Sequence, residues 1–274
     1  MTEETLFACI GLQEEMRGRI RAFEETFDYG EVRKELDMLR TPGDWEQGLS
    51  GLKDRLGEDR DGVKILACML RCCLKTWEEY EKRGISQDIF TATMKCFPRF
   101  IGECEKARGS MGFDRAFWTP RQLSMVLFRL GELEYEMTEK DGEKSVSIHI
   151  PSDARLTEEA CRESFRMARE FFRTYDPDYA EAPYWCCSWL MSPALKELLP
   201  GDSRILGFQN YFEITKVFEE EPAYLEWVYQ IKERECPPED LPENTSLQRK
   251  MKAWLLAGGK VGEGLGVLKP EAFD

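Results

Sequence analysis

The side chains best suited to proton transfer lie close together in the middle of the chain. The single histidine, His149, follows a stretch in which Glu134 and Glu136 alternate with apolar residues. Imidazole titrates near neutral pH, so His149 is a candidate general base. A lone histidine in a strand is more often structural than catalytic, and both interpretations of His149 stay open.

Further along the chain, a thiol and two phenols are candidate proton donors. Cys187, Tyr184 and Tyr211 each carry a weakly acidic group. Cys187 is also a candidate nucleophile if neighbouring strands bring it beside His149. The ten cysteines include no C-x-x-C pair and the chain has one histidine, so we expect buried thiols and no metal site.

Composition limits the class of protein and its partners. The chain has 274 residues, 42% of them hydrophobic and 12% aromatic, enough to bury a core in one large or two ordinary domains. A net charge of −14 disfavours nucleic acid and anionic membranes as partners. No basic secretion signal and no apolar run of about eighteen residues is visible, so we expect a cytoplasmic protein with reduced thiols.

The first part of the chain has the apolar spacing of amphipathic helices. Gly84 is a typical helix stop and Ser86 a typical N-cap. The segment around 62–82 has the widest apolar face, which places it at the centre of a bundle. The predicted helices cover 5–27, 31–40, 45–56, 62–82 and the segment from 86 to about 101.

The periodicity changes after residue 127. Apolar and glutamate residues alternate to 137, a turn follows at 140–143, and β-branched residues alternate over 145–150, so 127–150 is predicted as a β-hairpin. Thr157 is a candidate N-cap for the helix that comes next. The later predictions are a helix at 157–174, strands at 184–190 and 205–217, helices at 193–199, 222–232 and 246–257, and a flexible glycine-rich tail at 258–266.

Four segments carry a family resemblance. They are Phe128-Arg-Leu-Gly-Glu-Leu-Glu-Tyr-Glu136, Ser147-Ile-His-Ile-Pro151, Cys187-Ser-Trp-Leu190 and Ser203-Arg-Ile-Leu-Gly-Phe208. They resemble bacterial GNAT-like acyltransferases with a helical N-terminal domain and a GNAT-like C-terminal domain. The resemblance implies an α+β fold: a helical N-terminal bundle over 1–118, then a GNAT-like mixed β-sheet domain with flanking helices over 119–274.

The resemblance also implies a reaction. An acyl group would pass directly from acetyl-CoA or another acyl-CoA to a small-molecule amine or a peptide. Strand 145–150 would offer backbone amides to the thioester, and the following helix N-terminus would take the pyrophosphate. The implied CoA contacts are Ile150, Ser152, Arg155 and Thr157. The implied proton acceptors are Glu134 and Glu136, and the implied donors are Tyr184, Cys187 and Tyr211.

The predicted phosphate loop departs from the family pattern. Residues 151–157 contain no glycine, and Asp153, Glu158 and Glu159 add negative charge where phosphates would bind. A glycine-rich stretch at 259–264 is a minor alternative for this loop. Two other functions therefore stay open: a non-catalytic ligand-binding or interaction module on the same fold, and an acyl or hydrolytic enzyme that uses Cys187 and His149.

Overall fold

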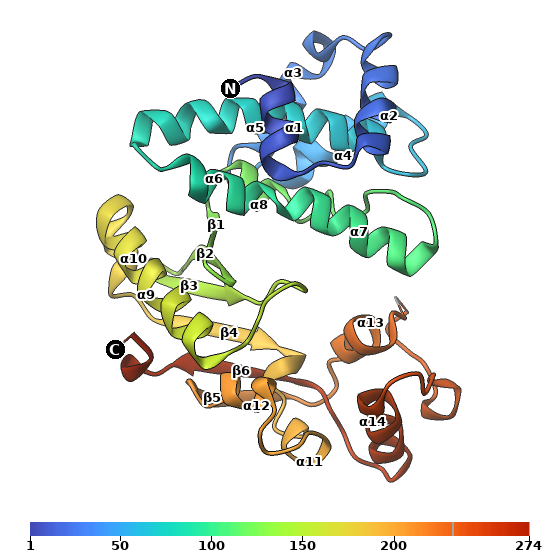
Figure 1. Ribbon diagram of the computed structural model, residues 1–274, viewed down its shortest axis with the longest axis vertical. Helices are drawn as coiled ribbons and strands as arrows, with labels where there is room; N and C mark the ends of the chain where they lie inside the picture. Colours follow the sequence, from blue (N-terminus) through green and yellow to red (C-terminus); the bar gives the residue numbers. More distant parts are fainter. Residues whose placement is uncertain (232, 274) are drawn as a thin grey trace. The chain divides into compact units, whose positions relative to one another are not determined.

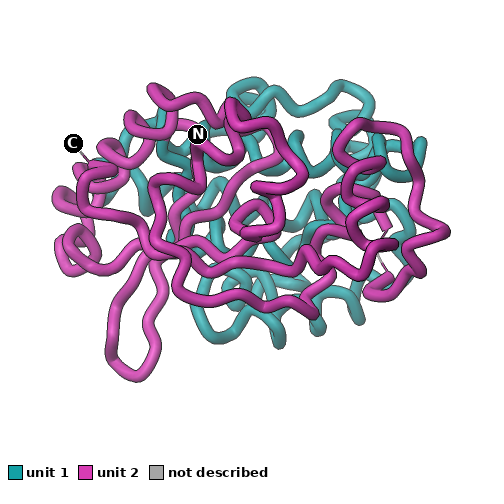
Figure 2. Tube along the Cα trace, turned by 90° about the horizontal axis from the view of Figure 1, so that it is seen from below, with its two compact units in different colours: residues 1–130 teal, residues 131–274 magenta. Residues whose placement is uncertain are grey.

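The computed structural model describes residues 1–231 and 233–273. The chain folds as two compact units, residues 1–130 and 131–274 (Figure 2). The first unit is largely helical and the second contains a mixed sheet with helices, which confirms the expected α+β class. The domain boundary predicted from the sequence, between residues 118 and 119, lies earlier in the chain than the division between residues 130 and 131. It stays a prediction.

The first unit is built from short helices around one long one (Figure 1). The prediction of a single helix over 5–27 is wrong. Gly11 adopts a left-handed conformation (φ +71°) and its N–H donates to the carbonyl of Ala8, which ends the first helix. The elements are α1 (Glu3–Ile10), α2 (Glu14–Glu24), α3 (Arg33–Leu39), α4 (Trp45–Leu56), α5 (Val63–Arg83), α6 (Gln87–Met94), α7 (Cys96–Arg108), α8 (Pro120–Leu123) and β1 (Leu127–Leu130).

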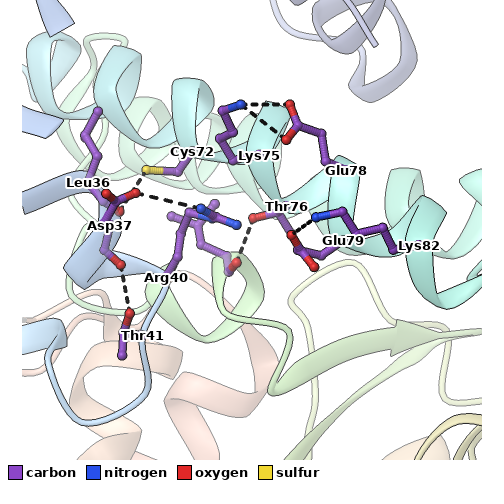
Figure 3. Close-up of polar contacts among 11 residues, drawn as sticks. Leu36, Asp37, Arg40, Thr41, Cys72, Lys75, Thr76, Glu78, Glu79 and Lys82 are labelled. Carbon is purple, nitrogen blue, oxygen red and sulfur yellow. Dashed lines mark hydrogen bonds and ion pairs between the residues drawn. The ribbon is translucent and has the colours of Figure 1, made fainter. Parts of the chain in front are cut away.

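Helix α5 is central to this unit, as its wide apolar face predicted. Twelve of its 21 residues are buried. Two of its buried polar groups bond to neighbouring backbone: Thr76 Oγ1 donates to the carbonyl of Leu123 at 2.7 Å, and Cys72 Sγ to that of Leu36 at 3.5 Å. Ion pairs such as Lys75–Glu78 lie on the solvent side of the same helix (Figure 3). The helix therefore buries apolar surface without leaving these hydroxyl and thiol groups unpaired.

Two glutamates from different helices meet near the start of the chain. Burial raises the pKa of Glu3 to about 7, and the nearby Glu24 carboxylate contributes to the shift. Glu24 also accepts a hydrogen bond from the Tyr29 hydroxyl at 2.5 Å. Because the pKa of Glu3 in the folded state exceeds its usual value of 4.5, the folded chain holds this proton more tightly than the unfolded chain.

We expect the stability from this proton to be complete below about pH 4.5 and to be lost as the pH rises through 7. Replacing Glu3 by Gln removes the charge, so E3Q should raise Tm at pH 8 by about 3–6 °C, for a gain of about 1–2 kcal/mol after solvent screening. Thermal unfolding at pH 5 and pH 8 measures this. The exposed Glu15→Gln is the control, and an equal Tm gain for E3Q at both pH values would contradict the assignment.

The second unit is a mixed sheet in which only one neighbouring pair of strands is parallel. From β2 onward the order is β2-β3-β4-β6-β5, with β3 and β4 parallel and the other pairs antiparallel. Its strands are β2 (Leu133–Lys140), β3 (Glu143–His149), β4 (Tyr184–Ser188), β5 (Phe212–Phe218) and β6 (Glu263–Leu268). Its helices are α9 (Glu158–Tyr175), α10 (Pro177–Ala180), α11 (Leu195–Leu198), α12 (Arg204–Gln209), α13 (Ala223–Tyr229) and α14 (Ser246–Leu256).

Several sequence predictions for this unit are confirmed. The β2–β3 hairpin forms with its turn after Lys140, and Thr157 Oγ1 caps α9 by accepting from the N–H of Ala160. The helix predicted at 246–257 is α14, which begins with a capping box at Thr245. Capping residues and apolar periodicity are local signals, which explains why these elements were predictable.

Three predictions for the second unit need correction. Residues 127–130 form the separate strand β1, because the chain turns at Gly131 (φ +70°). The strand predicted at 205–217 begins as helix α12, which Ser203 caps, and becomes strand β5 only at Phe212. The predicted flexible tail at 258–266 contains the start of β6, which lies between β4 and β5. The helix predicted at 222–232 is α13, and residue 232 lies outside the described residues.

Helix α9 covers one face of the sheet and so defines two faces. Tyr135 Oη lies 2.9 Å from Ser164 Oγ of α9, and the rings of Tyr184 and Phe172 are 6.2 Å apart. Side chains alternate along strands, so the neighbours of these residues point the other way. We call that side the opposite face; it carries Glu134, Glu136, Ser145, Ser147, His149, Trp185 and Cys187.

Candidate active site

The two parallel strands pair for a short distance and then separate. Only Val146 with Tyr184 and Ser147 with Trp185 are in register between β3 and β4. Beyond this point β3 runs on to His149 beside β2, and β4 runs on to Ser188 beside β6. The inner edges of β3 and β4 are therefore not paired with each other past residues 147 and 185. Backbone groups at such an opening can bond to an extended ligand inserted between the strands.

The predicted bases come together on the opposite face. His149 Nε2 lies 2.8 Å from Glu136 Oε2, and Glu134 stands directly across from His149 in the β2–β3 register. Glu134 is buried, whereas the His149 side chain is 26% exposed. A neutral imidazole that donates from Nε2 to a carboxylate carries its lone pair on Nδ1. In that tautomer the Glu136 carboxylate orients the His149 ring.

Cys187 has a different partner. Its Sγ donates to Glu263 Oε2 at 3.8 Å. Partial desolvation of the thiol, together with the Glu263 carboxylate, raises the pKa of Cys187 to about 11. At neutral pH the thiol is therefore protonated, which opposes a nucleophilic role and is compatible with a proton donor.

The two candidate tyrosines lie on the α9 side of the sheet. Tyr184 is buried against aromatic rings, and burial raises the pKa of its phenol well above the ordinary value. The Tyr211 hydroxyl donates to the carbonyl of Glu158 at 3.4 Å, and its ring packs against Phe165. Burial also raises the pKa of Tyr211. The structure thus separates both phenols from the His149–Glu136 pair.

The loop that follows β3 leads directly into α9. Arg155 is held there by Glu132: its backbone N–H donates to Oε2 at 2.8 Å, and Nη2 to Oε1 at 2.6 Å. A phosphate bound by Arg155 would have to displace this carboxylate. Ser152 is exposed, and the side chain of Thr157 caps the first turn.

A hollow of about 550 Å³ lies beside the first turn of α9. Its size is that of a small-molecule site. Three cations line it, and they come from distant parts of the chain: Arg162, Arg204 and Lys269. Arg162 stacks 5.4 Å from the Tyr211 ring, and Lys269 Nζ donates to the carbonyl of Asn210 at 2.8 Å. Acidic side chains also line the hollow, namely Glu158, Asp202 and Glu271.

Sequence reasoning missed these three cations. Arg162 lies inside the segment predicted as a helix at 157–174, and Arg204 stands directly before the segment predicted as a strand at 205–217. The local signal for Arg204 was its position directly after Ser203, a good N-cap residue. Within the described part of the chain, no group of three or more histidine, cysteine or acidic side chains is arranged to hold a metal ion.

The second unit combines a parallel strand pair that separates with a helix that begins near the open end of that pair, an arrangement that fits a GNAT-like domain. Residues 127–268 match the family described as the GNAT-like C-terminal domain, and residues 1–125 match the N-acyltransferase N-terminal domain. The chain belongs to this family of GNAT-like acyltransferases, which confirms the resemblance recognised in the sequence. Among curated proteins no match was found.

Solved structures share the fold over the whole chain. A crystal structure of an acyltransferase in complex with decanoyl-CoA and teicoplanin is similar with a TM-score of 0.69 and 23% identity, covering 98% of this chain and 99% of that chain. An acyltransferase in complex with CoA and 10C-teicoplanin gives a TM-score of 0.69 at 22% identity, with the same coverage. In the described ranges, none of the helices is both long and apolar enough to cross a bilayer.

Proposed function

We propose that this protein is an acyl-CoA-dependent N-acyltransferase that transfers the acyl group directly to an amine. The observation that carries the proposal is the separation of β3 and β4 after residues 147 and 185, which opens two strand edges beside the His149–Glu136 pair. The similar solved structures hold decanoyl-CoA or CoA, which supports the same donor here.

The donor would lie along the opening. The CoA phosphates would bind at the first turn of α9, where unpaired N–H groups and the helix dipole favour anions, with Ser152 and Thr157 nearby. Arg162, Arg204 and Lys269 would hold the nucleotide end in the adjoining hollow. The pantetheine would then follow the inner edges of β3 and β4, next to Ile150.

The acceptor would approach the thioester from the opposite face. His149 takes the proton from the amine as its nitrogen attacks the thioester carbonyl, and Glu136 stabilises the imidazolium that forms. The new N–C bond replaces the C–S bond, and the leaving thiolate takes a proton from Cys187 or solvent. Glu134, in register with His149, is the alternative proton acceptor.

The acceptor is proposed as a small-molecule amine or a peptide. The acyltransferase of similar fold that holds teicoplanin supports an acceptor of this kind. We place the protein in the cytoplasm, because the cysteines of the described chain are thiols and seven of the ten are buried.

We expect acetyl-CoA to raise Tm, because a ligand that binds the folded chain stabilises it. We also expect Arg204→Ala to weaken CoA binding by roughly tenfold or more, because a charge-assisted contact to phosphate is lost. Arg204 is exposed, so its removal should not disturb folding. Isothermal titration with CoA measures the dissociation constant. Arg166→Ala, which removes an arginine of α9 that pairs with Glu163 outside the hollow, is the matched control.

Arg155→Ala tests the loop separately. If Arg155 binds phosphate, its loss weakens CoA binding as Arg204→Ala does; if it only anchors the loop through Glu132, the affinity changes little. The absence of any Tm shift with CoA or acetyl-CoA would refute the proposed function and leave the non-catalytic module as the better description.

A further inference from the structure

The opening between β3 and β4 ends where the two strands are still paired, at Ser147 and Trp185; we call this its closed end. CoA phosphates at the N-terminus of α9 would lie beyond the carboxyl end of β3, because the loop after Ile150 leads into that helix. A donor entering from there runs back along β3, so its acyl chain points toward the last paired residues, Ser147 and Trp185. This step rests on the proposed function.

The α9 side of that closed end is sealed. Around the pair, the side chains that point toward α9 are Val146, Ile148, Tyr184 and Cys186, and each is at most 3% exposed. The Tyr184 ring is packed between Tyr135 at 6.3 Å and Phe273 at 5.1 Å. A growing acyl chain therefore has no room on this side and must turn toward the opposite face.

On the opposite face the indole of Trp185 blocks the way. Its Nε1 donates to Ser145 Oγ at 3.1 Å, so the ring reaches from β4 across to β3 beneath the closed end. Ser145 Oγ is itself 2.8 Å from Thr138 Oγ1 of β2. Three strands thus fix the orientation of one half-buried aromatic side chain. A tryptophan tied down in this way defines a wall rather than a mobile cover.

On the other side of β4, away from the indole, the neighbouring side chains of this face are apolar. Val267 of β6 stands opposite Trp185, and Leu265 stands opposite Cys187, both on the same face. His149 lies two residues beyond Ser147, so the thioester and the indole are separated by roughly 6–7 Å along the strand. That length accommodates a short acyl chain, whereas a longer one would need the volume that Trp185 fills.

From this geometry we infer that Trp185 sets the length of the acyl chain, and that the donor is a short-chain acyl-CoA. Replacing Trp185 by Ala frees the volume that the indole fills between β4 and Ser145. Each added methylene then gains favourable burial instead of a clash, and differences of this kind are worth roughly tenfold or more in kcat/KM.

The test compares CoA thioesters from acetyl to decanoyl, with a primary amine as acceptor and release of CoA thiol as the readout. In the wild-type protein kcat/KM should fall as the chain lengthens past about four to five carbons, the length that 6–7 Å allows. Trp185→Ala should raise the ratio of decanoyl to acetyl kcat/KM by roughly tenfold or more. Ser145→Ala frees the indole and should produce a smaller change in the same direction.

Controls separate this inference from the proposed function. Trp227→Ala removes an exposed tryptophan of the same unit and should leave the chain-length profile unchanged. If Trp185→Ala does not fold, Trp185→Leu and Ser145→Ala carry the test, with binding of each thioester measured by titration calorimetry. A wild-type preference for decanoyl-CoA, or the same profile in all the variants, overturns the role of Trp185 and leaves acyl transfer intact. If the wild-type protein neither binds CoA nor turns over the thioesters, the proposed function itself is contradicted.

Discussion

Replacing His149 by Ala is expected to lower kcat for acyl transfer by about 10²–10⁴-fold, the range found when a positioned general base is lost. The imidazole is the group on the opposite face whose orientation is set by a carboxylate, at 2.8 Å between Nε2 and Glu136 Oε2. KM for the acyl-CoA should change little, because the donor contacts that we propose lie at α9 and along the strand edges. Steady-state kinetics with a saturating amine measure both constants.

Three companion variants make the result specific. Glu136→Gln keeps a hydrogen-bond partner for the ring but removes the charge that stabilises imidazolium, so a smaller loss of kcat is expected. Glu139→Gln, on the exposed end of β2, is the matched control. Cys187→Ser should stay active, since the thiol is protonated at neutral pH. Loss of activity in Cys187→Ser with trapping of an acyl-enzyme would favour the cysteine mechanism over direct transfer.

The clustering of His149, Glu134 and Glu136 on one face was predictable from the sequence, because it depends on local geometry. In an antiparallel hairpin, alternation places Glu134, Glu136 and His149 on one face once the turn after Lys140 is recognised. The turn and the alternation are both visible in one stretch of chain. The hydrogen bond itself was not predicted, since diagonal contacts depend on the register of the strands.

The three cations that line the hollow beside α9 were not predictable in the same way. Arg162, Arg204 and Lys269 come from the first turns of α9, the start of α12 and the end of β6. Only the tertiary fold brings these segments to one hollow. Arginine and lysine are mostly exposed to solvent, so the sequence around each of the three residues, taken alone, predicts only a surface position.

Strand β6 shows where residue composition misled the prediction. Its glycines at 264 and 266 alternate with Leu265 and Val267, a two-residue period that was interpreted as a flexible tail because glycine is rare inside strands. In the folded chain the two glycines point to the same side. Cβ atoms there would come within 2.3 Å of the Met191 carbonyl oxygen at 264 and within 2.8 Å of Met191 Cε at 266. The glycines permit close approach of neighbouring chain rather than motion.

Gly264→Val is therefore expected to have a large effect on stability. Any Cβ at this position lies 2.3 Å from the carbonyl oxygen and 2.7 Å from the carbonyl carbon of Met191, both of them backbone atoms of a fully buried residue. Backbone cannot rotate away as a side-chain end can, so the short helical turn over Trp189–Met191 or strand β6 must shift. We expect a loss of about 3 kcal/mol, which lowers Tm by roughly 6–12 °C.

The position of β6 makes this loss functional as well as structural. Gly264 pairs with Ser188 of β4 on one side and with Val217 of β5 on the other, so a shifted β6 weakens both ladders. Urea unfolding and CoA titration of Gly264→Val should both show the change, whereas Gly102→Ala, where an added Cβ meets nothing within 4 Å, should keep wild-type stability. Wild-type stability in Gly264→Val would mean that Met191 does not pack against β6 in solution. The glycine-rich segment would then be the flexible tail that its composition suggested.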